Sequence, residues 1–425
     1  MIWLMDLFIG KQSGLTLAQR FKRKTIVSIA GLFSGIGGLE LPFHRRGVSA
    51  AILCDLWDAS QSVLREHFPG VPIWEDIREL PALPEDVKII TAGFPCTDLS
   101  QAGRTAGISG SESGLVTHVF RLLESREVEW LVLENVRNML ALDKGHAMSF
   151  LVSRLESLGF RWAYRLVDSR FSGVAQRRHR VLLVASRKHD PRNVLFADEA
   201  GEPCSATLRD DAFGFYWTEG LTGLGWAQDA VPPLKGGSTV GIPSPPAVWL
   251  PNASEGVKLV TPSIEDAEAL QGFERGWTAV AQTGPRKGPR WKLVGNAVTV
   301  GVSDWLVGRL FDPGDVVVES APLKVGSRWP DAAYGEAGKI WQVKASHWPV
   351  RQTYRHLTDM LTVKNLSPLS HRAATGFLER ALRSKLRFDP LFLADVESHI
   401  KATYSERPPA ITSRTKSTVS TRACA

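Results

Sequence analysis

The residues best suited to chemistry form the segment Gly93-Phe94-Pro95-Cys96, which follows an apolar run over residues 87–92. A short continuous apolar run predicts a buried parallel strand. The segment therefore places the Cys96 thiol on a loop at the carboxyl edge of a sheet, where open α/β sheets bind their ligands. A lone cysteine is more often buried and inert than nucleophilic, so its neighbours decide its role.

Two further groups of polar residues lie beside later strands. Glu134 follows the apolar run 130–133, and a carboxyl group buried at that edge could stay protonated and donate a hydrogen bond to a ring nitrogen. The run Gln176-Arg177-Arg178-His179-Arg180 precedes the apolar residues 181–185. A run of charges is usually a solvated face. Arginines beside a thiol, however, lower its pKa and bind anionic oxygens.

The strands before the cysteine predict a cofactor site. Residues 26–33 indicate a strand, and Ser34-Gly35-Ile36-Gly37-Gly38 a tight turn into a helix, which is typical of the nucleotide-binding opening of a doubly wound fold. Asp55 ends the next strand and could accept ribose hydroxyls, with residue 56 or 57 packing on adenine. Asp76, at the end of a third strand, suits an adenine amino group. Each acid alone is more often a cap or loop residue, but three successive strand ends favour the cofactor interpretation.

Composition describes an ordinary soluble globular protein of two or three domains, with 425 residues of which 44% are hydrophobic and 22% charged. Its four cysteines show neither metal-ligand spacing nor a disulfide pattern, so we expect no metal and a reducing cytoplasm. The apolar first nine residues fit neither a signal peptide nor a membrane span. Residues 312–425 hold 17 Lys/Arg and 11 Asp/Glu, most of the net charge of +7. This favours either nucleic-acid contact or a solvated basic surface.

Six motifs follow one another between residues 25 and 310. They are Leu32-Phe33-Ser34-Gly35-Ile36-Gly37-Gly38-Leu39, Gly93-Phe94-Pro95-Cys96, Glu134-Asn135-Val136, Gln176-Arg177-Arg178-His179-Arg180, Leu270-Gln271-Gly272-Phe273 and Gly295-Asn296-Ala297-Val298. Each is weak alone, but in this order and spacing the chain resembles the DNA (cytosine-5)-methyltransferase family. Residues 187–256, where the alternation of strands and helices is lost, fall where that family places its target-recognition region.

The resemblance implies a covalent mechanism on a cytosine flipped out of the duplex. Cys96 adds to C6 of the base, and C5 then attacks the methyl group of S-adenosyl-L-methionine. Glu134 hydrogen-bonds N3, Arg180 contacts the carbonyl oxygen of the base, and Arg178 supports the catalytic loop. We therefore expect a sequence-specific DNA cytosine-5 methyltransferase.

The family's motifs also imply binding residues. The expected cofactor-binding residues are Phe33, Ser34, Gly35, Ile36, Gly37, Gly38, Asp55, Leu56, Asp76, Ile77, Phe94, Asn296 and Ala297. The expected DNA-binding residues are Gln176, Arg177, Lys235, Gly236, Gly237, Ser238, Arg286, Lys287 and Arg290. Four positions depart from the family's usual residues: Gly31 replaces an acid, Asp55 a glutamate, Thr97 a glutamine and Lys258 an arginine. None of these departures removes a catalytic group.

We expect an α/β fold, with a doubly wound Rossmann-like methyltransferase sheet, a small irregular target-recognition domain and a mainly helical C-terminal extension. The expected segments are an N-terminal extension (1–24), a catalytic and cofactor-binding domain (25–186, completed by 292–311), the small domain (187–291), an accessory C-terminal domain (312–407) and a disordered tail (408–425). The accessory domain includes an amphipathic basic helix, residues 371–387, which either touches DNA or serves as a packing or oligomer contact.

The expected partner is double-stranded DNA, bound by a monomer that either accompanies a cognate restriction endonuclease or acts alone as a solitary or phage enzyme. One alternative is a cytosine-5 methyltransferase of the same fold that acts on transfer RNA. Another is a DNA-binding regulator without catalysis. A nicotinamide-dependent oxidoreductase would explain the glycine turn, but it would leave Cys96, Glu134 and the arginine run without roles.

Overall fold

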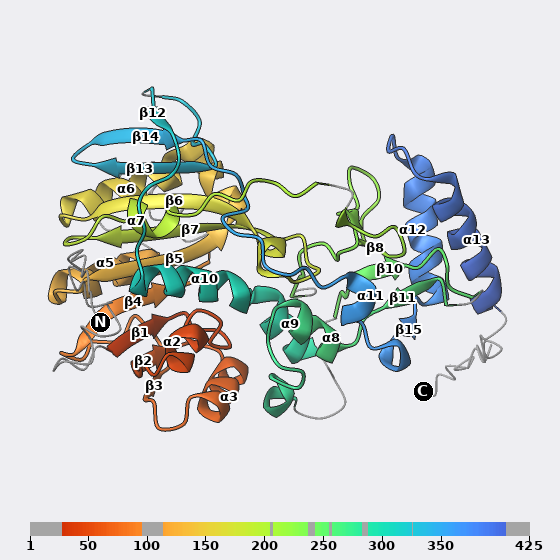
Figure 1. The fold of residues 1–425 in the computed structure, drawn as a ribbon. Coiled ribbons are helices and arrows are strands. Elements are labelled where there is room, and N and C mark those ends of the chain that lie inside the picture. The colour runs from red at the N-terminus through yellow and green to blue at the C-terminus, as the bar shows by residue number, and fades with distance from the viewer. Residues whose placement is uncertain are drawn as a thin grey trace, which may run out of the picture.

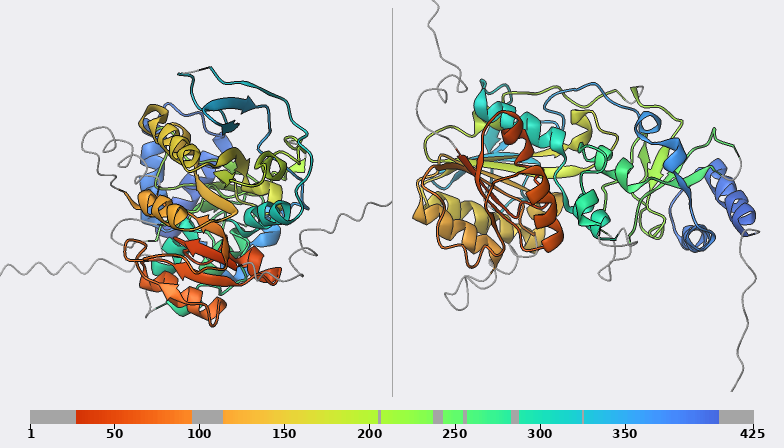
Figure 2. Two further views of the ribbon diagram at one scale, coloured as in Figure 1. Left: turned by 90° about the vertical axis from the view of Figure 1, so that its left-hand side faces the viewer. Right: turned by 90° about the horizontal axis from the view of Figure 1, so that it is seen from below.

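Two β-sheets organise the molecule. The computed structural model describes residues 28–95, 114–204, 207–236, 243–254, 257–282, 288–324 and 326–404. A ten-stranded sheet and a five-stranded sheet lie at opposite ends of an elongated molecule, with helices α8 (Ile264–Leu270), α9 (Gly288–Asn296) and α11 (Leu357–Met360) between them (Figure 1). Figure 2 shows the same two units side by side in its right-hand view.

The large sheet has a parallel half and an antiparallel half. The parallel half has the order β3-β2-β1-β4-β5, and its strands are β1 (Ser28–Leu32), β2 (Ala50–Cys54), β3 (Ile73–Trp74), β4 (Val87–Ala92) and β5 (Trp130–Val136). Beyond β5 the order continues β7-β6-β13-β14-β12, all antiparallel, with β6 (Arg161–Asp168), β7 (His179–Ser186), β12 (Ser320–Pro322), β13 (Ala332–Glu336) and β14 (Lys339–Val343). The carboxyl ends of the parallel strands therefore meet at one edge.

Helices cover both faces of this sheet because side chains alternate along each strand. In β5, Leu131 and Leu133 pack with helices α5 (Leu115–Ser125) and α6 (His146–Ser157). The intervening residues Trp130 and Val132 pack on the other face, with α2 (Leu41–Arg45), α7 (Arg192–Leu195) and α10 (Val300–Phe311). The expected doubly wound, Rossmann-like fold is confirmed. No helix among the described residues is long and apolar enough to cross a membrane.

The small sheet is antiparallel throughout, with the order β15-β11-β10-β8-β9. Its strands are β8 (Phe213–Phe215), β9 (Ala227–Gln228), β10 (Ala247–Trp249), β11 (Leu259–Thr261) and β15 (Ser367–Pro368). Phe215 and Trp249 on the sheet pack against Phe377 of α12 (His371–Arg383) and Phe392 of α13 (Pro390–Tyr404), with ring centroids 5.1 to 5.3 Å apart. The rings of Phe377 and Phe392 lie 5.8 Å from each other.

The expectation of a separate accessory C-terminal domain over residues 312–407 is wrong. Residues 320–343 instead extend the large sheet, where β13 pairs with β6 and brings Gly335 against the Trp162 ring. An ideal Cβ at Gly335 would lie 2.3 Å from that ring, so only glycine allows this approach. Residues 367–404 complete the small sheet and cover its apolar face. The physical reason is that a free strand edge and an uncovered apolar face both need a partner.

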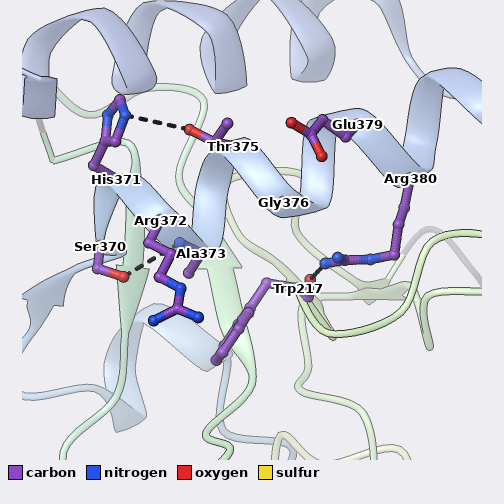
Figure 3. Close-up of a pocket in the computed structure, with 9 residues that line it drawn as sticks. All are labelled: Trp217, Ser370, His371, Arg372, Ala373, Thr375, Gly376, Glu379 and Arg380. Atoms are coloured by element: carbon purple, nitrogen blue, oxygen red, sulfur yellow. Dashed lines mark hydrogen bonds between the residues drawn. The ribbon is translucent and has the colours of Figure 1, made fainter.

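The basic helix α12 mainly packs against the rest of the protein. It ends at Arg383 rather than continuing to residue 387, and its buried face contacts the small sheet. Arg380 donates hydrogen bonds from Nη2 to the carbonyl oxygen of Trp217 at 2.6 Å and from Nε to that of Glu219 at 3.0 Å. Figure 3 shows Arg380 reaching this loop, with Ser370 capping the start of the helix. Of the two interpretations, packing accounts for the contacts of this helix.

Candidate active site

A cavity of about 570 Å³ lies at the carboxyl edge of the parallel strands. The loops that follow β1 to β4 line it, together with the end of α9. Most of the expected cofactor-binding residues are among its lining, namely Phe33, Gly35, Asp55, Leu56, Asp76, Ile77, Asn296 and Ala297. Residues that are far apart in sequence thus form one binding-sized space.

The glycine turn after β1 contributes Gly35 to the lining of this cavity. Gly35 has a φ of +56° with open space where a Cβ would stand, and its N–H donates a 2.8 Å hydrogen bond to Asp55. Gly37, with a φ of +81°, lies behind the turn, where a Cβ would meet the Phe68 ring at 2.3 Å. The remaining expected cofactor residues, Ser34, Ile36, Gly37, Gly38 and Phe94, are buried and support the lining without being part of it.

Asp55 and Asp76 differ in their surroundings. Asp55 accepts hydrogen bonds from the backbone N–H groups of Gly35 and Trp57, yet burial raises its pKa above the ordinary value. Asp76 pairs with Arg78, whose Nε lies 2.8 and 2.9 Å from the two carboxylate oxygens, and this pairing lowers the pKa of Asp76. Two half-buried strand-end carboxylates, one bonded to backbone N–H groups and one already paired with an arginine, therefore face the same cavity.

The structure adds lining residues beyond the expected cofactor-binding set, and two of them, Gly93 and Pro95, come from the cysteine motif. They are Cys54, Trp57, Ser60, Glu75, Arg78, Gly93, Pro95, Leu115, Lys292 and Leu293. Cys54, Glu75 and Arg78 adjoin expected residues, so proximity in sequence could have indicated them. Lys292 reaches the cavity through a contact between residues far apart in sequence, which one sequence does not reveal. Its ammonium group lies 4.7 Å from the centre of the Trp57 ring.

Glu134 and Arg180 meet beside this cavity. β5 and β7 pair antiparallel, with Glu134 opposite Leu182 and Val136 opposite Arg180, so Glu134 and Arg180 are diagonal neighbours. Arg180 Nε lies 2.9 Å from Glu134 Oε1. Burial raises the pKa of Glu134, although the positive charges of Arg180 and Arg178 oppose this shift. The site thus holds a buried carboxyl group whose pKa is raised, so that it keeps its proton to a higher pH than an exposed glutamate does.

Arg178 connects three separate segments. It is buried, and its guanidinium group donates to the carbonyl oxygens of Leu234 at 3.1 Å, Gly295 at 3.1 Å and Ala297 at 2.8 Å. These bonds join a loop of the small unit to the end of α9, which lines the cavity. Arg178 is accordingly a positioning residue rather than one that touches a substrate.

The loop that carries Cys96 is held from β5. Asn135 Nδ2 donates a 3.0 Å hydrogen bond to the carbonyl oxygen of Phe94, two residues before Cys96. Cys96 itself lies outside the described residues, as do Gly237, Ser238, Arg286 and Lys287. The described part of the loop therefore starts next to Glu134, at the same edge as the cavity.

Comparisons with known proteins agree with this arrangement. The family model for C-5 cytosine-specific DNA methylases matches residues 27–210. The type II methyltransferase M2.BsuMI of Bacillus subtilis (strain 168) is 44% identical over 384 residues, which cover 87% of this chain and 97% of that protein. The chain belongs to the C-5 cytosine-specific DNA methylase family. It is a DNA cytosine-5 methyltransferase, as its motifs predict.

Other members and relatives of the fold are more distant. The type II methyltransferase M.MspI of Moraxella sp is 25% identical to this methylase, over 64% of this chain and 67% of its own length. The crystal structure of the Dnmt2 methyltransferase of S. pombe matches with a TM-score of 0.50 and 14% sequence identity, covering 67% of this chain and 98% of that one. This structural likeness concerns the fold alone.

Two of the expected DNA contacts of the methylase are wrong, because their side chains are buried and bonded within the protein. Gln176 bonds to the carbonyl oxygen of Leu270 and to Gln271, both at 3.0 Å. Arg290 forms 3.0 Å ion pairs with Glu265 and Glu268. Neither side chain is available to DNA in this structure, because a buried, satisfied polar group is costly to expose.

Lys235 and Gly236, two further expected DNA contacts, lie in a loop of the small unit next to the end of α9. An ideal Cβ at Gly295 would lie 2.4 Å from the Lys235 backbone, so this loop packs directly on the end of α9. The Lys235 side chain pairs with Glu219 and lies 4.0 Å from the centre of the Tyr216 ring. Arg177 is only partly buried, and its backbone N–H donates to Val231. These three residues flank the junction that Arg178 holds together.

Gly31, where the family often has an acid, leaves room for a different carboxyl group. An ideal Cβ at Gly31 would lie 2.7 Å from Glu40 Oε1, which also accepts a 2.7 Å hydrogen bond from Thr91. Burial raises the pKa of Glu40 to about 7, and its Oε2 has no hydrogen-bond partner among the described residues. The methylase thus keeps a second buried carboxyl group directly beneath its glycine turn.

Glu40→Gln should stabilise the methylase above neutral pH. In the unfolded chain Glu40 ionises near its ordinary pKa of 4.5, but in the folded protein it keeps its proton until about pH 7. Its contribution to stability is therefore complete below pH 4.5 and falls as pH rises through 7. The glutamine variant lacks this loss and should gain on the order of 2 kcal/mol over wild type at pH 8. Urea unfolding at pH 5 and pH 8 measures the difference, and equal gains at both pH values would contradict the assignment.

Proposed function

We propose that this methyltransferase modifies one cytosine in a specific duplex sequence, using S-adenosyl-L-methionine and a cytosine flipped out of the helix. The observation that best supports this proposal is the hydrogen bond from Asn135 to Phe94. It joins the Glu134–Arg180 pair to the loop that leads to Cys96, at the edge that bears the cavity. The Glu134 carboxyl group, the loop that leads to Cys96 and the cavity are thereby held close together.

The cavity fits an adenosine cofactor. Asp55 offers carboxylate oxygens that can accept hydrogen bonds from ribose hydroxyls, and the Trp57 ring offers a flat apolar surface for an adenine. Its volume of about 570 Å³ falls within the range of small-molecule sites. When bound, S-adenosyl-L-methionine would supply an electrophilic methyl group. Phe33, Gly35, Asp76, Ile77, Asn296 and Ala297 complete the proposed binding set.

Asp55→Asn should weaken S-adenosyl-L-methionine binding by about 10- to 100-fold. The amide keeps the size of the side chain but loses the charge that strengthens hydrogen bonds to ribose hydroxyls. Isothermal titration calorimetry of the purified protein measures this change. Asp58→Asn, three residues further along in α3 (Asp58–His67) and exposed, is the matched control and should bind as wild type does. An unchanged affinity of the Asp55 variant would remove Asp55 from the proposed site.

In the proposed mechanism each residue has one task. The Cys96 thiolate forms a bond to C6 of the cytosine while the protonated Glu134 carboxyl donates a hydrogen bond to N3, which accepts the negative charge that develops on the ring. Arg180 orients Glu134 and contacts the carbonyl oxygen of the base. C5, made electron-rich, then takes the methyl group. A base removes the proton from C5, and the electron pair left on C5 expels Cys96 from C6.

The small unit is proposed to read the DNA sequence. Its irregular loops, with Arg177, Lys235 and Gly236 at the junction, face the region next to the cavity, and base edges are read by such side chains. Similarity to the type II methyltransferase M2.BsuMI favours the modification partner of a restriction endonuclease over a solitary enzyme. The same similarity favours DNA over transfer RNA as the substrate. We propose that the enzyme acts as a monomer in the cytoplasm.

Mapping of 5-methylcytosine tests this proposal. The protein is expressed in a methylation-deficient bacterium, and the genome is analysed by conversion sequencing, with the empty vector as control. We expect marks at one short sequence. Unmarked DNA from cells that contain folded protein, together with marked transfer RNA, would instead support the RNA-modifying alternative.

A further inference from the structure

A second cavity, with a basic lining, lies next to the carboxyl end of β5. It has a volume of about 700 Å³ and is formed by the short helices η1 (Arg137–Leu140) and η2 (Leu142–Gly145) and by residues 328–331. The residues that matter for its chemistry are Arg137, Asn138, Lys144, Arg328, Trp329 and Asp331, and we call this site the basic pocket. None of the family motifs includes these residues.

The basic pocket adjoins the active site through the chain itself. Arg137 follows directly after β5 and lies three residues beyond Glu134. An extended chain advances about 3.3–3.6 Å per residue, so the two positions are at most about 11 Å apart. The basic pocket therefore begins close to the carboxyl group that would face the flipped base.

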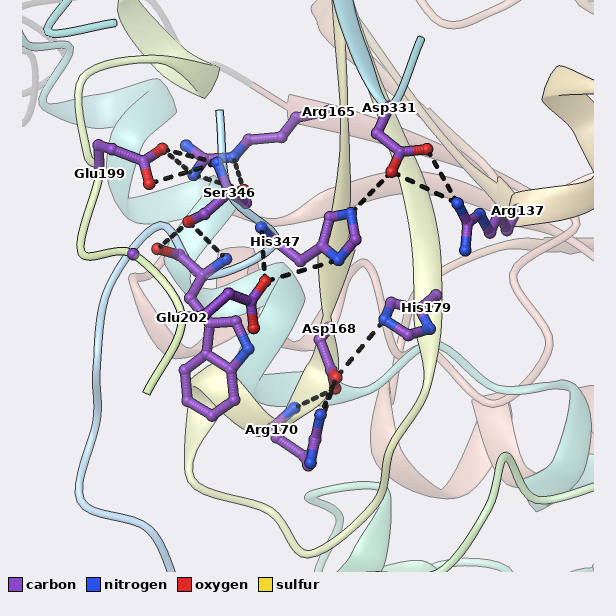
Figure 4. A network of polar contacts seen from close by, with 12 residues as sticks. Arg137, Arg165, Asp168, Arg170, His179, Glu199, Glu202, Asp331, Ser346 and His347 are labelled. Carbon is purple, nitrogen blue, oxygen red and sulfur yellow. Dashed lines mark hydrogen bonds and ion pairs between the residues drawn. The ribbon is translucent and has the colours of Figure 1, made fainter. Parts of the chain in front are cut away.

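Positive charge dominates the basic pocket. Its one carboxylate, Asp331, is shared, because it lies 3.3 Å from Arg137 and 2.9 Å from His347 (Figure 4). Lys144 and Arg328 are exposed, and neither forms an ion pair with another described residue. Two cations are therefore left to attract an anion, and a third is only partly neutralised.

The turn that carries Lys144 is fixed by a hydrogen bond and by aromatic packing. Asp143, Lys144 and Gly145 have φ angles of 50°, 56° and 90° in succession. Trp329 Nε1 donates a 3.0 Å hydrogen bond to the carbonyl oxygen of Gly145, and its ring lies 6.0 Å from the buried Trp162 ring. Lys144 is thus presented on a turn that a buried tryptophan cluster holds in place.

We propose that the basic pocket binds backbone phosphates of the substrate DNA next to the flipped cytosine. This inference rests on the proposed function. Arginine and lysine side chains are the usual partners of DNA phosphates, and such contacts set the position of the duplex without reading its sequence. The pocket would hold the strand beside the carboxyl end of β5, close to the target nucleotide.

The test is DNA binding by Lys144→Ala, Arg328→Ala and the double variant, measured by fluorescence anisotropy on an unmethylated duplex at several salt concentrations. Each removed phosphate contact should lower the slope of log affinity against log salt by about 1. The double variant should bind about 10-fold more weakly at 0.15 M salt. Its KM for DNA should rise, while kcat at saturating DNA and its affinity for S-adenosyl-L-methionine stay unchanged. Arg328→Lys should restore binding.

Lys401→Ala is the matched control, because Lys401 is exposed on α13 at the other end of the molecule. Variants whose affinity and salt slope equal those of this control would overturn the proposal, even with an active wild-type enzyme. A wild-type protein that binds DNA but transfers no methyl group would contradict the proposed function instead. The two failures are therefore distinguishable.

Discussion

Replacing Cys96 with serine should reduce methyl transfer to DNA by at least about 10⁴-fold. The proposed first step needs an anionic sulfur, and a thiol is partly ionised near neutral pH, whereas a serine hydroxyl is not. Without addition at C6, C5 of cytosine stays a poor nucleophile. The measurement is incorporation of a labelled methyl group into duplex DNA under single-turnover conditions.

Cys204→Ser is the control for this change, because Cys204 is a free and exposed cysteine that belongs to none of the motifs. Its activity should equal that of wild type. The Cys96 variant should still bind DNA and S-adenosyl-L-methionine with unchanged affinity. Full methylation by the Cys96 variant would refute the covalent mechanism, and loss of DNA binding would indicate a structural role for this residue.

Glu134→Gln should lower kcat by about 10²- to 10⁴-fold. Burial raises the pKa of Glu134, so the wild-type carboxyl stays protonated to a higher pH than an exposed glutamate and can donate its proton toward N3. The wild-type rate should therefore fall as pH rises through this raised pKa. The residual rate of the glutamine variant should lack this alkaline fall, because an amide does not ionise in that range. Rate measurements between pH 5 and pH 10 give both quantities.

Glu129→Gln serves as the comparison, since Glu129 directly precedes β5 at the opposite end of the strand from the cavity. We expect its rate and pH profile to match those of wild type. A Glu134 variant with wild-type kcat, or with the same alkaline fall as wild type, would show that another group supplies the proton. Thermal unfolding of the variants shows whether loss of the partner of Arg180 changes stability as well.

Several of the expected cofactor-binding residues line one cavity because the carboxyl ends of parallel strands must meet. Phe33, Asp55 and Asp76 each follow a strand, and once the strands pair in parallel their side chains converge whatever the lengths of the intervening helices. The same reasoning placed Glu134 near the cysteine loop. Strand ends are therefore the part of an active site that one sequence predicts well.

Burial of polar side chains could not be predicted in this way. Gln176 and Arg290 occur in polar stretches that suit DNA contact, but both are enclosed by segments distant in sequence. Arg178 likewise gains its three carbonyl partners only when residues 234, 295 and 297 come together. Residue type gives the capacity for a hydrogen bond, whereas tertiary contacts decide whether a protein group or a ligand satisfies it.

The pairing of β13 with β6 has a consequence for synthesis of the protein. Trp162 on β6 pairs with Gly335 on β13, so the ribosome must add about 170 residues before the edge strand β6 gains its partner. Pairing between such distant segments is slow, and an open strand edge readily joins another chain. A nascent chain that stops before residue 332 would carry the cysteine loop, Glu134 and the cofactor cavity, yet it would expose an aggregation-prone edge. The last quarter of the polypeptide thus protects the folding of the first half.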